Sequence, residues 1–554
     1  MYFLLISVPV ALAGLCFALK IAAGPYWHYY DSCYSYLING LNIASGKQTF
    51  FFYHPGTPVQ LLCSSVMRVL NIGRSSSEMI NRVLADPELY LSAVHAVLVA
   101  LFLVSSLLLV IDVYRKTRDF LAAFVMQLPG LIALGISVLS IPAGANVAPE
   151  LLLMSIINLY ILSLFQLFSS GSPYQEWRAA LWLGFLCGLG ISTKYSFFPL
   201  ALVPLLVLHW REKILFLIVA LGAFLLWTMP LWYAYSNLWG AIQLNLCNVS
   251  GGTPRVGFFN FSSFISVLGQ VARDFWFFVL VSCGALILSF IKPVMDKSNR
   301  YLFLLRASAL GVLFQFFVLG RHYMPYYAIP GVCLSGLVLL MIFLIYKPQS
   351  FRFMGVLLLG VYICCTAYAV FVCVEQARMI RQGDTFVKEL RSQYPGYYII
   401  SSYIMPAPIE AHALSYGVDT AGNQVVDALS RQYPFMTTYD PGAHMIWNHT
   451  SRWLADDLMN KFPGILIVGG QLDLVTNSPH QVRLVKHQGD LYAYLLIAST
   501  EKQANILFVN AKAFLSQGKY VEAAIFASKS LEFGFNARAE AEAILKEAKD
   551  QLSR

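Results

Sequence analysis

The chain has few charged residues: Asp, Glu, Lys and Arg make up only 12% of its 554 residues, against about 25% in soluble domains. Acids are scarcest in residues 1–374, which hold 11 of them against 21 Lys and Arg, whereas residues 375–554 hold 18 and 17. Cysteine is absent after Cys373, and the ten cysteines lie mostly inside apolar stretches. These shortages exclude a soluble globular protein, a disordered chain and a disulfide-stapled domain.

Long apolar stretches are abundant instead, and most reach the roughly 20 residues that a membrane-spanning helix needs. Eleven of them are present, at about 2–24, 88–112, 119–141, 147–169, 178–192, 195–209, 214–235, 272–291, 301–319, 325–346 and 352–374. We therefore predict an α-helical polytopic membrane domain of about 11 transmembrane helices over residues 1–374.

The basic loops predict how this domain is oriented, because Lys and Arg accumulate on the cytoplasmic side of a membrane. With eleven crossings, the groups at Arg115–Arg118, Arg211–Lys213 and Lys292–Arg300 all lie on the side of the N-terminus. We predict a multi-pass protein of the bacterial inner (plasma) membrane with a cytoplasmic N-terminus and an extracytoplasmic (periplasmic) tail. The positive charge then anchors loops, and we expect no nucleic-acid partner.

The extracytoplasmic side receives a long first outer loop, residues 25–87, and several short turns. Within this loop, residues 57–70 carry apolar side chains at helical spacing and predict an amphipathic helix at the membrane surface. The stretch 178–209 is treated as two short helices broken near Lys194, because one crossing would put the later basic loops outside.

Asp31 follows the first span inside an aromatic run, YWHYYDSCYSY, that contains Tyr30 and Tyr34. Two interpretations are open. Asp31 is a solvated loop carboxylate or helix cap, or it is a general base that takes a hydroxyl proton in a partly desolvated pocket. The aromatic side chains suit either an interfacial belt or a sugar-binding surface, to which Tyr53 and Tyr326 would also contribute.

Glu150 opens the fourth span in the segment ANVAPELLLM, on the same predicted side as Asp31. It is a first-turn acid favoured by the helix dipole, or it fixes a substrate hydroxyl or a divalent cation together with Asp31. A metal needs more ligands than two acids, so Mg²⁺ or Mn²⁺ is a minor expectation and no cofactor is required.

Four basic residues share this side of the membrane and are candidate phosphate ligands: Arg321 and His322 in GRHYMPYY, Lys194 in STKYS, and His54 in YHPGTP. Each could instead be an ordinary interfacial or turn residue. Arg321 is the strongest candidate, because a guanidinium offers a planar bidentate fork and stays protonated.

These segments, taken in order, resemble the GT-C superfamily of integral membrane glycosyltransferases, which includes protein O-mannosyltransferases and lipid A aminoarabinose transferases. The resemblance covers about 350 residues. It consists of Asp31 after the first span, followed by SYLINGLNIASGK, YHPGTP, VAPELLL, TKYSFFPLALVPLL and RHYMPYYAIPG.

The resemblance implies a sugar donor linked to polyprenyl phosphate, transfer on the extracytoplasmic face, and inversion at the anomeric carbon. Asp31 would then take the acceptor proton, while Arg321, helped by His322, Lys194 or His54, would stabilise the departing phosphate. The acceptor is a lipid, a glycan or a protein. Two alternatives from other classes remain: a transporter or flippase of a lipid-linked saccharide, and a non-catalytic membrane receptor.

The tail predicts two further parts. Residues 375–500 alternate short apolar runs with turn-rich pieces, which is typical of a small α/β domain with buried strands at 398–402 and 465–468. Residues 501–554 have Gly518, Tyr520, Ala523 and Ala527 spaced as in a tetratricopeptide (TPR) helical hairpin.

Overall fold

The structure is a computed structural model of the chain. In the N-terminal part it describes residues 2–26, 30–51, 56–138, 141–170, 176–240, 261–291, 298–320 and 323–346. Later it describes residues 370–375, 385–402, 420–432, 438–440, 445–447, 452–454, 464–469, 481–488, 491–497, 500–532 and 538–553, with a few single residues between them. The chain divides into two compact units, one of residues 1–376 with 420–424, the other of residues 377–419 with 425–554.

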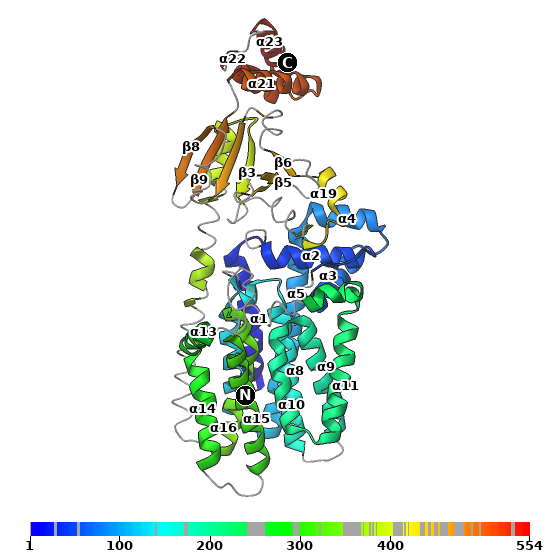
Figure 1. The fold of residues 1–554 in the computed structure, drawn as a ribbon, viewed down its shortest axis with the longest axis vertical. Coiled ribbons are helices and arrows are strands. Elements are labelled where there is room, and N and C mark those ends of the chain that lie inside the picture. The colour runs from blue at the N-terminus through cyan, green and yellow to red at the C-terminus, as the bar shows by residue number, and fades with distance from the viewer. Residues whose placement is uncertain are drawn as a thin grey trace. The chain divides into compact units, whose positions relative to one another are not determined.

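The first unit is a helical bundle (Figure 1). Among its described residues, five helical segments are long and apolar enough to cross a membrane. They are α1 (Tyr2–Ala23), α5 (Pro87–Thr117), α8 (Pro149–Ser170), α15 (Ser298–Leu319) and α16 (Ile329–Tyr346) with the preceding turn η6 (Pro325–Ala328). The protein is therefore an integral membrane protein.

Two bent helix pairs would raise the number of spans to seven. One joins α11 (Trp210–Trp227) to the segment Met229–Gly240 at 80°, and the other joins α13 (Phe261–Asp274) to α14 (Trp276–Ile291) at 91°. The count of eleven thus stays a prediction, and most of the stretch 352–374 lies outside the described residues.

The apolar stretch 119–141 does not form the continuous helix that its composition suggested. It forms two short helices, α6 (Phe120–Val125) and α7 (Leu128–Gly135), and then a hairpin of β1 (Ser137–Val138) and β2 (Ile141–Pro142). Pro129 in the first turn of α7 explains the break, because proline lacks an N–H and starts a helix better than it continues one.

The stretch 178–209 breaks at Lys194, where the sequence predicted a break. Helix α9 (Glu176–Thr193) ends there, and the 3₁₀ segment η4 (Tyr195–Ala201) and helix α10 (Leu202–Val207) follow. The side chain of Lys194 is thereby placed at the joint between two short apolar helices.

The first outer loop folds into three helices, α2 (Tyr30–Ala44), α3 (Thr57–Leu70) and α4 (Ser76–Ala85). The helix predicted at 57–70 is confirmed as α3. Val59, Cys63 and Met67 are buried, whereas Val69 and Leu70, apolar residues of the predicted pattern, are exposed. In Figure 1, α2 and α3 run across the direction of the long helices at one end of the bundle.

The second unit contains a seven-stranded mixed sheet of order β6-β5-β4-β3-β7-β9-β8. Its strands are β3 (Tyr398–Ser402), β4 (Thr438–Asp440), β5 (Met445–Trp447), β6 (Arg452–Leu454), β7 (Gly464–Gly469), β8 (Gln481–Gln488) and β9 (Leu491–Ile497). The two strands predicted from sequence are confirmed as β3 and β7, which pair in parallel at the centre of the sheet.

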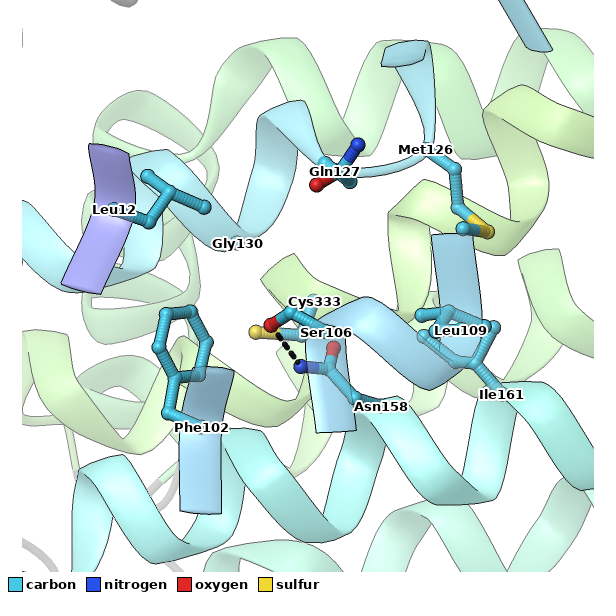
Figure 2. Close-up of a pocket in the computed structure, with 10 residues that line it drawn as sticks. All are labelled: Leu12, Phe102, Ser106, Leu109, Met126, Gln127, Gly130, Asn158, Ile161 and Cys333. Carbon is cyan, nitrogen blue, oxygen red and sulfur yellow. Dashed lines mark hydrogen bonds between the residues drawn. The ribbon is translucent and has the colours of Figure 1, made fainter. Parts of the chain in front are cut away.

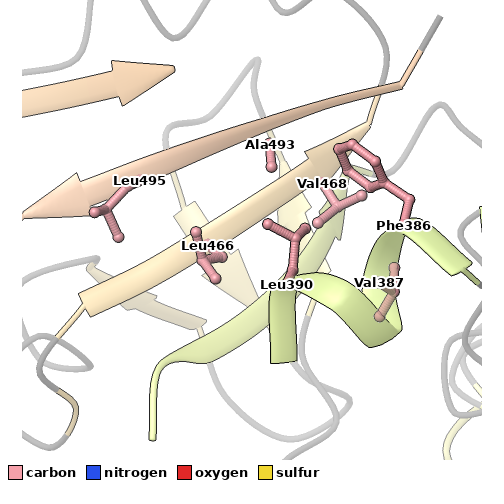
Figure 3. Close-up of a cluster of buried hydrophobic side chains, with 7 residues drawn as sticks. All are labelled: Phe386, Val387, Leu390, Leu466, Val468, Ala493 and Leu495. Atoms are coloured by element: carbon pink, nitrogen blue, oxygen red, sulfur yellow. The ribbon is translucent and has the colours of Figure 1, made fainter. Parts of the chain in front are cut away.

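The core of this unit lies between the sheet and the helix at residues 385–393 (Figure 3). Phe386 and Leu390 of the helix pack against Leu466, Val468 and Leu495 of β7 and β9. The unit also contains the short helix α19 (Val426–Gln432).

Three helices follow the sheet: α21 (Thr500–Ser516), α22 (Tyr520–Glu532) and α23 (Arg538–Leu552). Ala523 and Ala527 are buried in the α21–α22 hairpin beside Leu507, and Gly518 has a φ of +73° in the turn. The hairpin forms where it was expected, and its identity as a TPR unit stays a prediction.

Candidate functional site

Glu150 and Lys194 form a buried ion pair, which we call the Glu150–Lys194 pair. Glu150 is in the first turn of α8, and the Lys194 Nζ donates to its Oε1. The two residues are only 1% and 3% exposed. Burial lowers the pKa of the Lys194 ammonium, and the adjacent carboxylate of Glu150 opposes that shift. The other carboxylate oxygen, Oε2, is buried with no hydrogen-bond partner among the described residues.

Two tyrosines of η6 cover the Glu150–Lys194 pair. The Lys194 Nζ lies 4.2 Å from the ring centroid of Tyr326 and 4.9 Å from that of Tyr327, within the range of cation–π attraction. The two rings pack edge to face with centroids 4.7 Å apart. Three residues singled out from sequence, Glu150, Lys194 and Tyr326, are therefore brought together from three distant segments.

The local sequence explains why η6 is held at this place. Pro325 begins the 3₁₀ turn, and the Gln315 side chain of α15 donates from Nε2 to the Tyr327 carbonyl at 2.9 Å. Before this turn, the Tyr323 hydroxyl donates to Oδ2 of Asp274 at 2.6 Å. The segment that follows Arg321 and His322 is thus tied to two neighbouring helices.

Helix α2, which carries Asp31, is linked to the start of α8. The Cys33 thiol lies 2.6 Å from Oδ1 of Asn146, and both residues are buried. Asn146 follows the turn η2 (Ala143–Ala145) and precedes Glu150 by four residues. The backbone of Asp31, two residues before Cys33, therefore lies near the end of α8 that bears Glu150.

Asn39 of α2 shapes the segment that leads to Tyr53 and His54. Its Oδ1 accepts hydrogen bonds from the Thr49 hydroxyl at 2.6 Å and from the Phe50 and Phe51 amides at 2.9 and 3.3 Å. Oε1 of Gln60 in α3 lies 2.7 Å from the same Thr49 hydroxyl, whose single proton is shared between the two oxygens. Asn39, Thr49 and Gln60 are buried, and their hydrogen bonds account for the first asparagine of the SYLINGLNIASGK segment.

A short segment from the tail, residues 420–424, belongs to the first unit and packs on α2. Asn42 donates to the Ala421 carbonyl at 3.0 Å, and the Thr420 hydroxyl donates to Ser35 Oγ at 3.0 Å. Lys47 donates to the Gln424 carbonyl. Gly422 has a φ of +66°, and a Cβ there would lie 2.3 Å from the Phe50 ring.

Several predicted site residues lie outside the described residues: Tyr53, His54, Arg321 and His322. Asp31 and Tyr30 begin α2, and only their backbone is described. Tyr34 is fully buried, and its hydroxyl donates to Oε1 of Glu88 at 3.1 Å.

Sequence reasoning missed Glu88, Asn39 and Asn42. A signal was present, because Glu88 is one of only 11 acids before residue 375 and the two asparagines lie in the otherwise apolar run LINGLNIA. Buried polar side chains of this kind are kept in a fold by specific hydrogen bonds.

In the described part of the chain, no group of three or more His, Cys, Asp or Glu side chains is arranged to hold a metal ion. A cavity of about 20 Å³ lies among the bundle helices, between α1, α5, α8, α16 and the α6–α7 segment (Figure 2). Ser106, Gln127 and Asn158 supply uncharged polar groups to its lining, and Asn158 donates to Ser106 Oγ at 2.9 Å. This volume suffices for about one water molecule.

The fold and site define an integral membrane protein with a buried acid–base pair and an organised outer loop at one end of its bundle. The chain is similar to two crystal structures of ArnT from Cupriavidus metallidurans, one bound to undecaprenyl phosphate and one in the apo state. Identity is 13% and 14%, and in each case 90% of this chain and 98% of that chain are covered with a TM-score of 0.49.

ArnT is a lipid A aminoarabinose transferase of the GT-C type, the kind of enzyme that the sequence motifs resemble. No family model matches the chain, and no curated protein matches it. Likeness at this identity and TM-score carries no activity or residue role to this chain.

Proposed function

We propose that the protein is a glycosyltransferase that moves a sugar from a polyprenyl-phosphate donor to an acceptor hydroxyl on the extracytoplasmic membrane face. The observation that carries the proposal is the convergence of three segments. The start of α8, the joint after α9 and the turn before α16 meet in the Glu150–Lys194 pair and Tyr326. The link from Cys33 to Asn146 brings the helix that bears Asp31 to the same end of the bundle.

In the proposed reaction, the acceptor oxygen bonds to the anomeric carbon while the bond from that carbon to the phosphate oxygen breaks. The acceptor proton goes to the Asp31 carboxylate, and the polyprenyl phosphate leaves with its negative charge stabilised by Arg321. His322, His54 and Lys194 are the further proposed ligands of the departing phosphate, and Lys194 shares its charge with Glu150. Tyr30, Tyr53 and Tyr326 are the proposed aromatic residues around the sugar. Tyr34, predicted together with them, is fully buried and bound to Glu88, so we do not place it at the sugar.

In the proposed reaction, the Glu150–Lys194 pair contributes a preorganised charge. A buried ammonium held by a carboxylate and two aromatic rings is fixed in place before any substrate binds, so little reorganisation is needed during the reaction. Oε2 of Glu150 is buried without a partner among the described residues, so a substrate hydroxyl reaches it only if this buried region opens on binding.

The cavity in the bundle does not decide between transfer and transport. Its volume of about 20 Å³ is far below the roughly 300 Å³ of a small-ligand pocket, and it is lined by no acidic or basic side chain. A transporter usually keeps ionisable groups or broken helices near the bilayer midplane, and the two bent helix pairs keep the transport alternative open to the test that follows.

The test uses the purified full chain in proteoliposomes with a panel of radiolabelled polyprenyl-phosphate sugars, and measures release of free polyprenyl phosphate. We expect release from one donor class. Asp31→Asn should lower the rate by roughly 10²- to 10⁴-fold, and Arg321→Gln by roughly 10²- to 10³-fold.

Asp119→Asn is the matched control. Asp119 caps α6 through the Leu121 and Ala122 amides in a loop predicted to lie on the opposite side of the membrane. Asparagine keeps that cap, so full activity is expected. Full activity of Asp31→Asn would remove Asp31 from the mechanism. No release from any donor, together with translocation of a labelled lipid-linked saccharide, would establish the transporter instead.

A further inference from the structure

Glu88, in the first turn of α5, holds the chain on both sides of Asp31. Its Oε2 accepts a hydrogen bond from the Tyr26 amide at 2.9 Å, and its Oε1 accepts from the Tyr34 hydroxyl at 3.1 Å. Tyr26 and Tyr34 are both fully buried. The single carboxylate of Glu88 thus holds Tyr26, five residues before Asp31, and Tyr34, three residues after it.

The position of Glu88 suits a carboxylate that accepts hydrogen bonds. The carboxylate is in the first turn of a helix, where the helix dipole stabilises negative charge. The Lys20 ammonium lies 3.6 Å above the ring of Tyr26, whose amide Glu88 binds, and donates to the Gly24 carbonyl. Hydrogen bonds to a carboxylate are about twice as strong as those between neutral groups. The bonds from the Tyr26 amide and the Tyr34 hydroxyl therefore hold both residues firmly on α5.

Two turns after Glu88, helix α5 also contacts the segment that leads into α8. Nε2 of His95 lies 2.9 Å from the Gly144 carbonyl, and the His95 ring packs edge to face on Tyr26. Gly144 is in the turn that leads to Asn146, and Asn146 contacts Cys33 of α2. The contacts form a closed ring: α5 holds α2 through Glu88, α5 holds η2 through His95, and α2 and η2 meet at Cys33 and Asn146.

We propose that Glu88 is a positioning residue for sugar transfer: its carboxylate sets the place of the start of α2, and so of Asp31, relative to Glu150. This inference rests on the proposed function. Nothing requires Glu88 to touch a substrate, because it acts through Tyr26 and Tyr34. Displacement of a reacting group by about 1 Å is enough to cost roughly 10²-fold in rate.

The first experiment measures kcat and KM for release of polyprenyl phosphate by the full chain. Glu88→Ala should lower kcat by roughly 10- to 100-fold with KM for the donor unchanged within about twofold. Glu88→Gln keeps one acceptor oxygen and should lie between Glu88→Ala and the unmodified protein. If Glu88→Ala fails to fold, the same measurement is made on Glu88→Gln.

Coupling to Tyr34 separates positioning from a general structural role. Tyr34→Phe removes the donor to Oε1, so the double variant Glu88→Gln/Tyr34→Phe should be no slower than the worse single variant. Glu212→Gln is the control, because Glu212 is also a first-turn acid, in α11, and its variant should keep full kcat. Multiplying effects in the double variant, or unchanged kcat in Glu88→Ala, would overturn the proposal.

A second experiment measures a disulfide crosslink and needs no enzyme activity, so its result does not depend on whether the proposed function is correct. Asn146→Cys should form a disulfide with Cys33 on mild oxidation, mapped by mass spectrometry, because the two side chains already touch. Adding Glu88→Ala should abolish or slow that crosslink. An undiminished crosslink would reject the positioning role whether or not the protein transfers a sugar, whereas loss of the crosslink in an inactive protein would reject only the transferase.

Discussion

The two acids at the starts of α8 and α5 are held in opposite ways. Glu150 is almost fully buried and is neutralised by a cation from another segment. Glu88 is only partly buried, and its oxygens bind a backbone amide and a hydroxyl. A fully buried charge needs a direct partner of opposite sign, whereas the partly buried Glu88 also interacts electrostatically with Lys20 and binds its two neighbours by hydrogen bonds. The same position in a helix therefore serves charge compensation in one region and loop positioning in the other.

The largest effect is expected at the Glu150–Lys194 pair. Lys194→Met leaves Glu150 buried without its cation, and breaking such a pair costs about 3–5 kcal/mol. We expect that loss in the free energy of unfolding of the purified protein in detergent. Lys116→Met is the control, since Lys116 pairs with Asp112 at 3.4 Å with both side chains partly exposed, and its loss should cost about 1 kcal/mol or less.

A double variant that removes both charges of the pair tests whether the loss in Lys194→Met comes from the uncompensated charge of Glu150. The double variant Lys194→Met/Glu150→Gln should be more stable than Lys194→Met alone, because no uncompensated charge remains. If the double variant loses the sum of the two single losses, charge compensation is not what holds this region together.

The next effect is expected in the hydrogen-bond network of α2. Asn39→Ala removes the acceptor of three donors, two of them backbone amides, and should cost about 1–3 kcal/mol. Asn39→Leu keeps a side chain of similar size without an acceptor and should lose a similar amount of stability. A nearly unchanged stability of Asn39→Leu would show that packing, and not hydrogen bonding, is what Asn39 provides.

A smaller effect is expected where the tail segment meets α2. Gly422→Ala adds a Cβ 2.3 Å from the Phe50 ring at a φ of +66°. The backbone strain alone costs about 1–2 kcal/mol. Gly46→Ala has the same strain at a φ of +73° but open space around the new Cβ. Hydrogen exchange of the α2 amides should rise more in Gly422→Ala, and an equal rise in both variants would argue against a specific contact.

The smallest effect is expected at Glu78, an exposed acid at the start of α4. Glu78 and Ser75 form a capping box, and the Ser75 backbone amide, the largest cause, holds the pKa of Glu78 below its usual value. Because the pKa of Glu78 is lower in the folded state than in the unfolded state, the ionised side chain adds stability at pH values above its unfolded pKa of 4.5. That stability is lost as the pH falls through the lower pKa of the folded state.

Hydrogen exchange of the Glu78 amide should therefore speed up, beyond its intrinsic pH dependence, as acid protonates the side chain. In Glu78→Gln this additional change should vanish. Its persistence would mean that another group titrates.

Apolar periodicity was enough to predict the long helices, helix α3 over residues 57–70, and strands β3 and β7. Each is a local pattern whose buried face is visible in the residues themselves. The stretch 119–141 was misjudged because composition alone does not distinguish one long helix from two short ones divided near Pro129. The pairing of Lys194 with Glu150 was not predictable, because the two residues are 44 positions apart and both were equally compatible with solvent.

By itself, the sequence determined that this chain enters a membrane, about where most of its long helices lie, and which scarce acids and bases were worth attention. Water and lipid act on each segment separately, so burial of apolar side chains can be inferred one segment at a time. Only the tertiary structure decided that Glu150 meets Lys194, that Glu88 holds both flanks of Asp31, and that residues 420–424 return to α2. Such contacts depend on the packing of distant segments to within a few tenths of an ångström, and no local pattern contains that information.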